Sequence, residues 1–341
     1  MAMPMSRHRP DYAGSTIWNA DMPPGDLIHL AEIIAARERI APFVAPTPML
    51  SPPGGPRLKA ESLHPCGAFK IRGAFNWLLS LPYAQRAGGV IAPSSGNHAQ
   101  AVAYAAQRLG IRALAVMPTS SPEAKRAGVR RWGADVKIVD PAIDGSAMAW
   151  AATHGPELGL TLIHPYDARE IIAGTGTLGL EILDDVTDPL TVYVPVSGGG
   201  LISGVAAAIR SVRSSVRIVG VEPELANDAS RSFRDGRRQA LPYAQTVRTM
   251  ADGLRVEQVG QLTWSHIQAL VDDMVTVTED EIGDAVAWVA REGRIVAEPS
   301  GAVSVAAARR DAAPDRAVAI VSGGNVDPAL YAALMNSGAV G

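Results

Sequence analysis

The chain has 341 residues, 47% of them hydrophobic and 19% charged, and its 31 Lys and Arg against 34 Asp and Glu give a formal net charge of −3. This balance excludes a disordered chain, a basic nucleic-acid-binding surface and a polybasic membrane-binding segment. The one cysteine, Cys66, excludes an internal disulfide framework and a cysteine-based zinc cage, and it fits a reducing, cytoplasmic setting.

The length and the N-terminal residues indicate the broad organisation. At about 150 residues per domain, a chain of this length predicts two domains. Residues 1–11 contain Pro and Arg and lack an apolar core, so we expect a loose tail and not a signal peptide. No uninterrupted apolar run approaches the roughly 20 residues that a membrane-spanning helix needs.

Short apolar runs, punctuated by Pro and Gly, alternate in character along the first half of the chain. Residues 89–93 are typical of a buried strand. Residues 98–109 carry apolar side chains at helical spacing and stop at Gly110, a residue suited to a helix C-terminus. In chain order we then expect a strand at 112–118, a helix at 122–131, a strand at 134–140, a helix at 145–158 and a strand at 161–165.

The same alternation returns in the second half, whereas residues 224–260 are polar and irregular and receive no assignment. We expect strands at 191–196, 216–221, 274–278 and 317–321, and helices at 201–212 and 279–292. The sequence therefore predicts an α/β protein with two open, mostly parallel sheets and helices on both faces. We place a smaller domain at residues 85–160 and a larger one at residues 1–84 together with 161–341.

A run of three glycines follows the predicted strand at 191–196. In Ser197-Gly198-Gly199-Gly200, the missing side chains let backbone N–H groups approach an anion, and the next helix adds its positive end. The run matches neither the dinucleotide-binding nor the ATP-binding glycine pattern. A phosphate site and a simple tight turn are therefore equally good interpretations of this segment.

Two more segments stand at strand–helix junctions. Ser94-Ser95-Gly96-Asn97-His98 offers hydroxyl, amide and imidazole groups at a helix N-terminus, which suits a carboxylate or a ring hydroxyl. A helix cap with a buried histidine explains it equally well. Ser322 follows the strand at 317–321, where it is either a cap or a partner for a ring heteroatom.

Lys70 lies between Phe69 and Ile71. An amine held in such an apolar setting has a lowered pKa and becomes a nucleophile that forms a Schiff base with a carbonyl. A surface lysine at the start of a helix is the alternative. Because ligands in open α/β sheets bind at the carboxyl ends of strands, we expect these segments to share one crevice.

The motifs AFKIRGA, SSGNHA, SGGGL, EPSGA and SGGN, in this order, resemble the tryptophan-synthase β-subunit superfamily of pyridoxal-phosphate enzymes, fold type II. More narrowly, they are similar to the serine/threonine dehydratase and serine racemase family. The resemblance runs from about residue 46 to 327. It implies that the larger domain binds the cofactor and that the smaller domain is mobile.

The resemblance also implies a role for each matching residue. Lys70, next to Phe69, would bond to the cofactor and move the Cα proton of the substrate, and Ser322 would meet the pyridine nitrogen. Because a serine does not force this nitrogen to be protonated, prompt β-elimination is favoured. The other implied contacts are Asn97 to the ring 3′-hydroxyl, Ser197, Gly198, Gly199, Gly200 and Leu201 to the phosphate, and Ser94, Ser95 and His98 to the substrate carboxylate.

Two features place the chain within the family. A hydroxyl at Ser95, on the cofactor face opposite Lys70, is what proton transfer on both faces requires, and racemases and 3-hydroxyaspartate ammonia-lyases resemble this chain there. Glu222, the carbonyl of Ala226 and Asp228 have the spacing of the family's Mg²⁺ or Ca²⁺ ligands, and carboxylates with a carbonyl suit a hard cation. A pair of solvated loop acids is the alternative.

Some positions depart from the family's usual pattern. Ala68 stands where serine is usual, Ser197 replaces a glycine of the phosphate loop, and Thr175 replaces a common glutamine. The sequence ends soon after residue 325, so we expect no C-terminal regulatory domain. Arg255 is a candidate for holding a second substrate carboxylate, although a surface arginine is equally plausible.

We therefore expect a pyridoxal-phosphate-dependent ammonia-lyase that converts serine, threonine or 3-hydroxyaspartate to a 2-oxo acid and ammonia. The alternatives are a racemase with a dehydratase side reaction, a β-replacement enzyme, and a non-catalytic phosphate-binding module. The resemblance further implies a homodimer with a small amino-acid substrate, a cation that is Mg²⁺ or Ca²⁺, and neither nucleic acid nor membrane as a partner.

Overall fold

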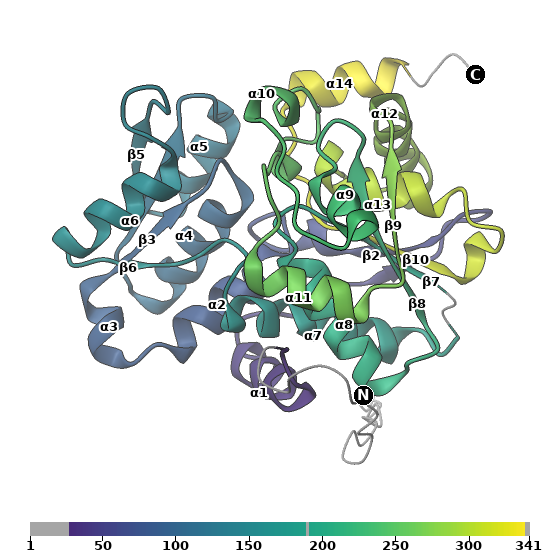
Figure 1. Cartoon of the computed structure of the whole chain (residues 1–341), viewed down its shortest axis with the longest axis horizontal. Helices are drawn as coiled ribbons and strands as arrows, with labels where there is room; N and C mark the ends of the chain where they lie inside the picture. Colours follow the sequence, from purple (N-terminus) through teal and green to yellow (C-terminus); the bar gives the residue numbers. More distant parts are fainter. Residues whose placement is uncertain (1–26, 189–190, 338–341) are drawn as a thin grey trace, which may run out of the picture.

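The computed structural model describes residues 27–188 and 191–337, which form two β-sheets surrounded by helices (Figure 1). We call the four-stranded sheet with its helices the smaller lobe and the six-stranded sheet with its helices the larger lobe. In Figure 1 the smaller lobe lies on the left and the larger lobe on the right. Within the described ranges, no helix is long and apolar enough to cross a membrane.

The smaller lobe contains the predicted alternation of strands and helices. Its strands pair in parallel in the order β5-β4-β3-β6, and their bounds are β3 Val90–Pro93, β4 Ala113–Pro118, β5 Asp135–Val139 and β6 Thr161–Leu162. Its helices are α3 Tyr83–Gly88, α4 Asn97–Leu109, α5 Glu123–Arg131 and α6 Ala147–Glu157. Helix α4 ends at Leu109, and the next residue, Gly110, has a left-handed φ of 67°, in agreement with the helix end predicted there.

The larger lobe has a sheet of order β1-β2-β10-β7-β8-β9, in which only the edge pair β1–β2 is antiparallel. The predicted α/β class with mostly parallel sheets is confirmed. The strands are β1 Met49–Leu50, β2 Arg57–Ala60, β7 Thr191–Pro195, β8 Arg217–Pro223, β9 Asp273–Val277 and β10 Ala317–Val321. The helices are α1 Leu30–Ile40, α2 Lys70–Ser80, α7 Arg169–Asp185, α8 Gly200–Val212, α9 Asp228–Asp235, α10 Tyr243–Thr246, α11 Gln261–Leu270, α12 Glu279–Trp288, α13 Pro299–Ala308 and α14 Pro328–Ser337.

Three predictions of secondary structure need adjustment. Of the strand expected at 161–165, two residues form β6, and they pair with β3 of the smaller sheet. The helix expected at 279–292 is α-helical to Trp288 and continues as a π-helix over Val289–Gly293. The unassigned segment 224–260 contains α9, α10 and the 3₁₀ turn Asp252–Leu254. The domain limits at 85 and 160 stay a prediction.

Helices α7 and α8 pack closely because small residues line their contact. A Cβ added at Gly204 would lie 2.4 Å from the carbonyl oxygen of Ile172, and one at Gly179 would lie 2.7 Å from Ala208. Thr175 faces the same contact and donates its hydroxyl to the carbonyl of Gly200 at 2.8 Å. The departure from glutamine at this position therefore has a structural role: it secures the start of α8.

A buried ionic cluster fixes α2 between two other elements. Arg72, which is 1% exposed, donates to Glu61 at 2.7 and 2.8 Å and to Glu181 of α7 at 2.6 and 2.9 Å. Lys59 adds a contact of 3.1 Å to Glu181. The arginine holds the pKa of Glu61 well below its usual range, although burial acts in the opposite direction. This cluster sets the position of α2, and hence of Lys70 at its start.

Arg72→Met should lower the free energy of unfolding by about 3–5 kcal/mol, because it leaves buried Glu61 without its guanidinium and Glu181 with Lys59 as its remaining cation. Urea denaturation of the cofactor-free protein measures this loss. Arg217→Met is the matched control, since Arg217 and Asp273 form an exposed pair at 2.6 Å whose loss should cost no more than about 1 kcal/mol. Equal losses in the two variants would contradict the role given to Arg72.

Candidate active site

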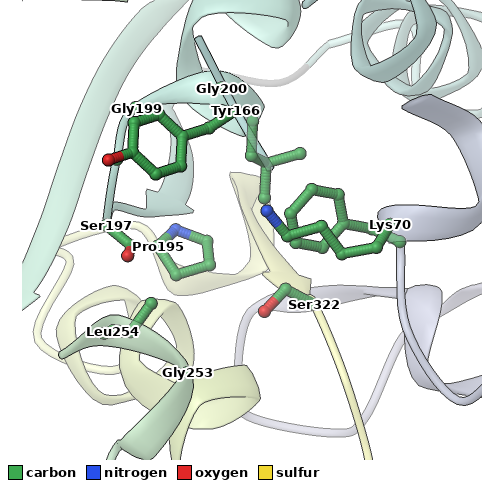
Figure 2. Close-up of a pocket in the computed structure, with 12 residues that line it drawn as sticks. Lys70, Tyr166, Pro195, Ser197, Gly199, Gly200, Gly253, Leu254 and Ser322 are labelled. Atoms are coloured by element: carbon green, nitrogen blue, oxygen red, sulfur yellow. The ribbon is translucent and has the colours of Figure 1, made fainter. Parts of the chain in front are cut away.

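Segments from several parts of the larger lobe meet in one pocket (Figure 2). The parallel order of the sheet places the carboxyl ends of β7 and β10 at the same edge, and the segments that follow these strands reach the pocket. Its lining consists of Phe69, Lys70, Tyr166, Pro195, Ser197, Gly198, Gly199, Gly200, Leu201, Gly253, Leu254 and Ser322. The structure thus brings together the predicted lysine, the whole glycine turn and the serine after β10.

The glycine turn is shaped for a group that approaches the backbone closely. Gly199, the N-cap of α8, has a φ of 91°, which a side chain would strain. A Cβ at Gly198 would lie 2.3 Å from the ring of Tyr166. Behind the turn, the Thr263 hydroxyl and the Gly260 N–H both donate to the carbonyl of Gly198, at 2.7 and 3.2 Å. The turn is therefore held rigidly at the positive end of a 13-residue helix.

Lys70 starts α2 and its amine points into the pocket (Figure 2). The Nζ atom donates to the carbonyl of Pro165 at 2.9 Å and lies 5.0 Å from the centre of the Phe69 ring. No carboxylate pairs with it in the part of the chain that the structure describes. Burial lowers the pKa of Lys70 to about 8. The amine is therefore much more easily deprotonated than an ordinary lysine.

The other three lysines of the sequence differ from Lys70. Lys59 pairs with Asp185 at 2.8 Å, and Lys125 pairs with Asp252 at 2.6 Å. Lys137 lies 5.4 Å from the ring centre of Trp150, in the smaller lobe. Lys70 is the one lysine that lines the pocket with the glycine turn, so it is the best placed amine nucleophile.

Ser322 is fixed to the segment that carries Lys70. Its carbonyl accepts from the N–H of Phe69 at 3.0 Å, and Ala68 forms an antiparallel bridge with Gly323. The Ser322 hydroxyl lies 3.5 Å from the carbonyl of Ser300 and contributes to the pocket. Ala68, a departure from the family pattern, therefore acts through its backbone and needs no hydroxyl for this contact.

The segment between β3 and α4 does not line this pocket. Ser95 is exposed, and the Ser94 hydroxyl accepts from the N–H of Gly96 at 3.1 Å. His98 is 3% exposed, and burial together with the charge of Lys70 lowers its pKa to about 3, so its ring is neutral. Asn97 donates to Glu298 at 2.5 Å. The expected substrate and cofactor contacts of these four residues stay predictions.

Four lining residues were not singled out from the sequence: Tyr166, Pro195, Gly253 and Leu254. Tyr166 stands just after the strand predicted at 161–165, so its place beyond a strand end is the signal that points to it. Its phenol is neutral, because burial and the charge of nearby Asp167 raise its pKa to about 12. Gly253 and Leu254 lie in segment 224–260, whose irregular sequence pattern gave no signal for them.

Glu222 and Asp228 lie together in the interior. The Glu222 carboxylate accepts from the N–H groups of Ala229 and Ser230 at 3.1 and 2.6 Å, and Asp228 Oδ2 accepts from Val259 N–H at 2.7 Å. Asp228 Oδ1 is buried and has no hydrogen-bond partner among the residues that the structure describes. Burial and the nearby Asp228 raise the pKa of Glu222 well above its usual value, and burial raises that of Asp228 to about 7. The alternative of solvated loop acids is therefore wrong.

Arg255 lies outside the Lys70 pocket. Its guanidinium donates to the carbonyl of Thr249 at 2.6 and 2.9 Å, and it lines a second pocket together with Lys125 and Glu298. Its candidate role with a second carboxylate has no support from this geometry.

Comparisons with known proteins agree with this geometry. Residues 40–323 match the family model described as pyridoxal-phosphate dependent enzyme. The chain is 41% identical over 285 residues to L-threonine ammonia-lyase of Thermotoga maritima, covering 83% of this chain and 70% of that protein. It is 39% identical over 311 residues to serine racemase of Schizosaccharomyces pombe, covering 88% and 95%.

The fold matches a solved structure of similar identity. Maize serine racemase superposes with a TM-score of 0.84 at 38% identity, covering 91% of this chain and 97% of that one. The family match spans most of the chain and includes the lysine, the glycine turn and Ser322. The chain belongs to the pyridoxal-phosphate-dependent enzyme family of fold type II, among the threonine ammonia-lyases and serine racemases.

Proposed function

We propose that this protein is an ammonia-lyase that removes water and ammonia from a β-hydroxy α-amino acid. Serine, threonine and 3-hydroxyaspartate are the candidate substrates, and a 2-oxo acid and ammonia are the products. The observation that carries the proposal is the half-buried amine of Lys70, which has no carboxylate partner among the described residues and lines the same pocket as the glycine turn and Ser322. The relatives named threonine ammonia-lyase support this reaction.

The residues present fit pyridoxal phosphate. Backbone N–H groups of Ser197, Gly198, Gly199, Gly200 and Leu201 would hold the phosphate at the start of α8, and no side chain blocks three of these positions. Ser322 would meet the ring nitrogen, Phe69 and Asn97 would border the ring, and Lys70 would hold the aldehyde carbon. When bound, the cofactor supplies a carbonyl for an amine and a ring that accepts the electrons of the broken Cα–H bond.

The protein's own groups would handle the protons. Because its pKa is lowered to about 8, Lys70 deprotonates readily near neutral pH and can take the Cα proton. Ser94, Ser95 and His98 would hold the substrate carboxylate by neutral hydrogen bonds at the start of α4. Loss of the β-hydroxyl as water leaves an enamine, which then takes up water and releases ammonia.

The Lys70→Ala variant should lose the visible absorption band of bound cofactor and at least about a hundredfold of the activity, because the pocket then has no amine. Absorption spectra with added pyridoxal phosphate and an assay of 2-oxo-acid release measure both. Lys137→Ala, which removes a lysine outside the pocket, should keep the band and the activity. A Lys70→Ala protein with normal activity would exclude this mechanism.

A racemase is the second candidate function. Racemisation needs a proton donor on each face of the substrate, and the hydroxyl of Ser95, opposite Lys70, would supply the second one. The serine racemases of fission yeast and rice, at 39% and 40% identity, favour this reading as much as the lyases favour the first.

Ser95→Ala should abolish interconversion of L- and D-serine and leave pyruvate release from L-serine within about tenfold of the parent. The reason is that elimination needs a base on one face only, whereas racemisation needs groups on both. Chiral amino-acid analysis beside an ammonia assay measures the two rates. Equal losses of the two rates would show that Ser95 does not act as the second proton donor.

We further propose a Mg²⁺ or Ca²⁺ ion at Glu222 and Asp228, with the carbonyl of Ala226. The buried, unpartnered Asp228 Oδ1 and the raised pKa values of both acids fit a missing positive charge. No group of three or more His, Cys, Asp or Glu gathers for a metal among the residues described, so backbone and water ligands would complete the shell. Asp228 also holds Val259, whose side chain packs against Gly199 of the glycine turn.

Millimolar Mg²⁺ or Ca²⁺ should raise the melting temperature of the EDTA-treated protein, since an ion bound only by the folded state stabilises it. Binding at 100 times the dissociation constant corresponds to about 2.7 kcal/mol. Thermal unfolding followed by circular dichroism measures the shift. Asp228→Asn should remove it, and a parent protein indifferent to both ions would remove the metal site from the account.

The homodimer, the cytoplasmic location and the mobility of residues 85–160 remain part of this proposal. They come from the family resemblance, and solution mass, localisation and ligand-dependent scattering would test them separately.

A further inference from the structure

A buried ionic group that the proposed reaction does not use lies between the two lobes. Lys125 of α5, in the smaller lobe, extends to Asp252 at 2.6 Å and to Glu298 at 3.0 Å, both in the larger lobe. The side chains of Lys125 and Glu298 are 4% and 1% exposed. Glu298 is the residue before α13 and the first letter of the EPSGA motif. The motif therefore contains an acid that is fully inside the protein.

The second oxygen of Glu298 reaches the residue assigned to the cofactor ring. Asn97 donates from Nδ2 to Glu298 Oε1 at 2.5 Å, and Asn97 Oδ1 accepts from Asn325 Nδ2 at 3.0 Å. Asn325 Nδ2 also donates to the carbonyl of Cys66 at 2.9 Å. Because a carbonyl and a carboxylate can only accept, the two ends of this chain of bonds fix which way both amides face.

One hydrogen of the Asn97 amide remains without an acceptor in the described ranges of the chain. Asn97 has two N–H groups, and the structure gives only one of them a partner, Glu298. The amide adjoins Gly323, where an added Cβ would lie 3.1 Å from Asn97 Nδ2, and Gly323 follows the pocket residue Ser322. The network therefore holds a spare N–H donor beside the pocket.

Two glycines of the sequence motifs make room for the pair. A Cβ at Gly96 would lie 2.4 Å from Cδ of Lys125, and a Cβ at Gly323 would lie 2.2 Å from Oε1 of Glu298. Gly96 precedes Asn97 in SSGNH, and Gly323 belongs to SGGN. Neither glycine has a left-handed φ, so space for the ion pair is the physical reason for the missing side chain.

The charge of Lys125 decides whether Glu298 can keep its role as an acceptor. Burial raises the pKa of Glu298, and the ammonium of Lys125 lowers it; Asp252, the other charged group that faces it among the described residues, raises it. Without the ammonium, the buried carboxyl would take up a proton and lose its charge-assisted bond to Asn97. The Asn97 amide would then keep its bond from Asn325 and lose the strong acceptor that holds its Nδ2 in place.

We propose that Lys125 is a positioning residue, which acts through Glu298 to hold the Asn97 amide with its spare N–H available to the ring oxygen of the cofactor. This inference rests on the proposed function, which supplies the cofactor. It deepens that function by giving a residue of the smaller lobe, 28 positions from Asn97 along the sequence, control over a contact to the ring. Lys125 itself touches neither substrate nor cofactor in this arrangement.

The test measures cofactor binding without the covalent bond. In a Lys70→Ala background, the dissociation constant for pyridoxal phosphate is measured by fluorescence titration. Lys125→Met should raise it about tenfold, because a charge-assisted hydrogen bond is lost or misdirected. In the background that keeps Lys70, the same substitution should shift the visible absorption of bound cofactor toward the near ultraviolet, since the ring oxygen loses a donor.

Two further variants distinguish a role of Lys125 in positioning Asn97 from a role in holding the two lobes together. Asp252→Asn removes one acid from Lys125 and leaves Glu298 paired, so affinity should stay within about twofold of the parent. Adding Glu298→Gln to Lys125→Met should recover affinity, because a glutamine carbonyl accepts from Asn97 without needing a cation. Circular dichroism of the cofactor-free proteins checks folding, and Lys125→Gln replaces Lys125→Met if the latter does not fold.

Unchanged affinity and spectrum in Lys125→Met would overturn the proposal. An equal loss of cofactor affinity in Asp252→Asn would also overturn it. So would a Lys125→Met/Glu298→Gln protein that binds the cofactor no better than Lys125→Met, because Lys125 would then act only by joining the two lobes. If the native protein binds no pyridoxal phosphate at all, the proposed function itself fails, and that result is distinct from any of these.

Discussion

Burying a lysine amine costs free energy unless a carboxylate lies beside it, and the described structure places none next to Lys70. The cost is smaller when the amine is neutral, and the lowered pKa of Lys70, about 8, makes its neutral form easy to reach. Lys59 and Lys125, which are more deeply buried than Lys70, are each paired with two acids instead. The difference defines the site, because a paired ammonium is stable and inert whereas an unpaired amine is reactive.

The surrounding fold keeps acids away from this amine while holding it in place. Arg72, two residues further along α2, forms ion pairs with Glu61 and Glu181. The helix is therefore anchored by an ionic cluster that does not extend to the pocket. The bond from Phe69 N–H to the carbonyl of Ser322 links the lysine segment to the end of β10. Local neutralisation of charge thus lets the pocket remain apolar around Lys70 and electropositive at the glycine turn.

The sequence predicts the parts of this arrangement that depend on local pattern. The α/β class, the strand bounds near 89–118 and the position of Ser322 after a strand follow from periodicity and from glycine placement. Helix α13 was missed because all ten of its residues are buried, so no polar face marks its period. The Lys125–Glu298 pair was beyond reach because it joins residues 173 positions apart. Tyr166 and Leu254 enter the pocket from segments that only the tertiary structure brings together.

The site of covalent attachment tests the central claim most directly. Incubation with pyridoxal phosphate, reduction with borohydride to make a lysine–pyridoxal link permanent, and mass spectrometry of the peptides would locate it among the four lysines of the sequence. The account predicts one pyridoxyl group, on the peptide that contains Lys70. A stoichiometric label on Lys59, Lys125 or Lys137, or no label on a folded protein, would contradict it.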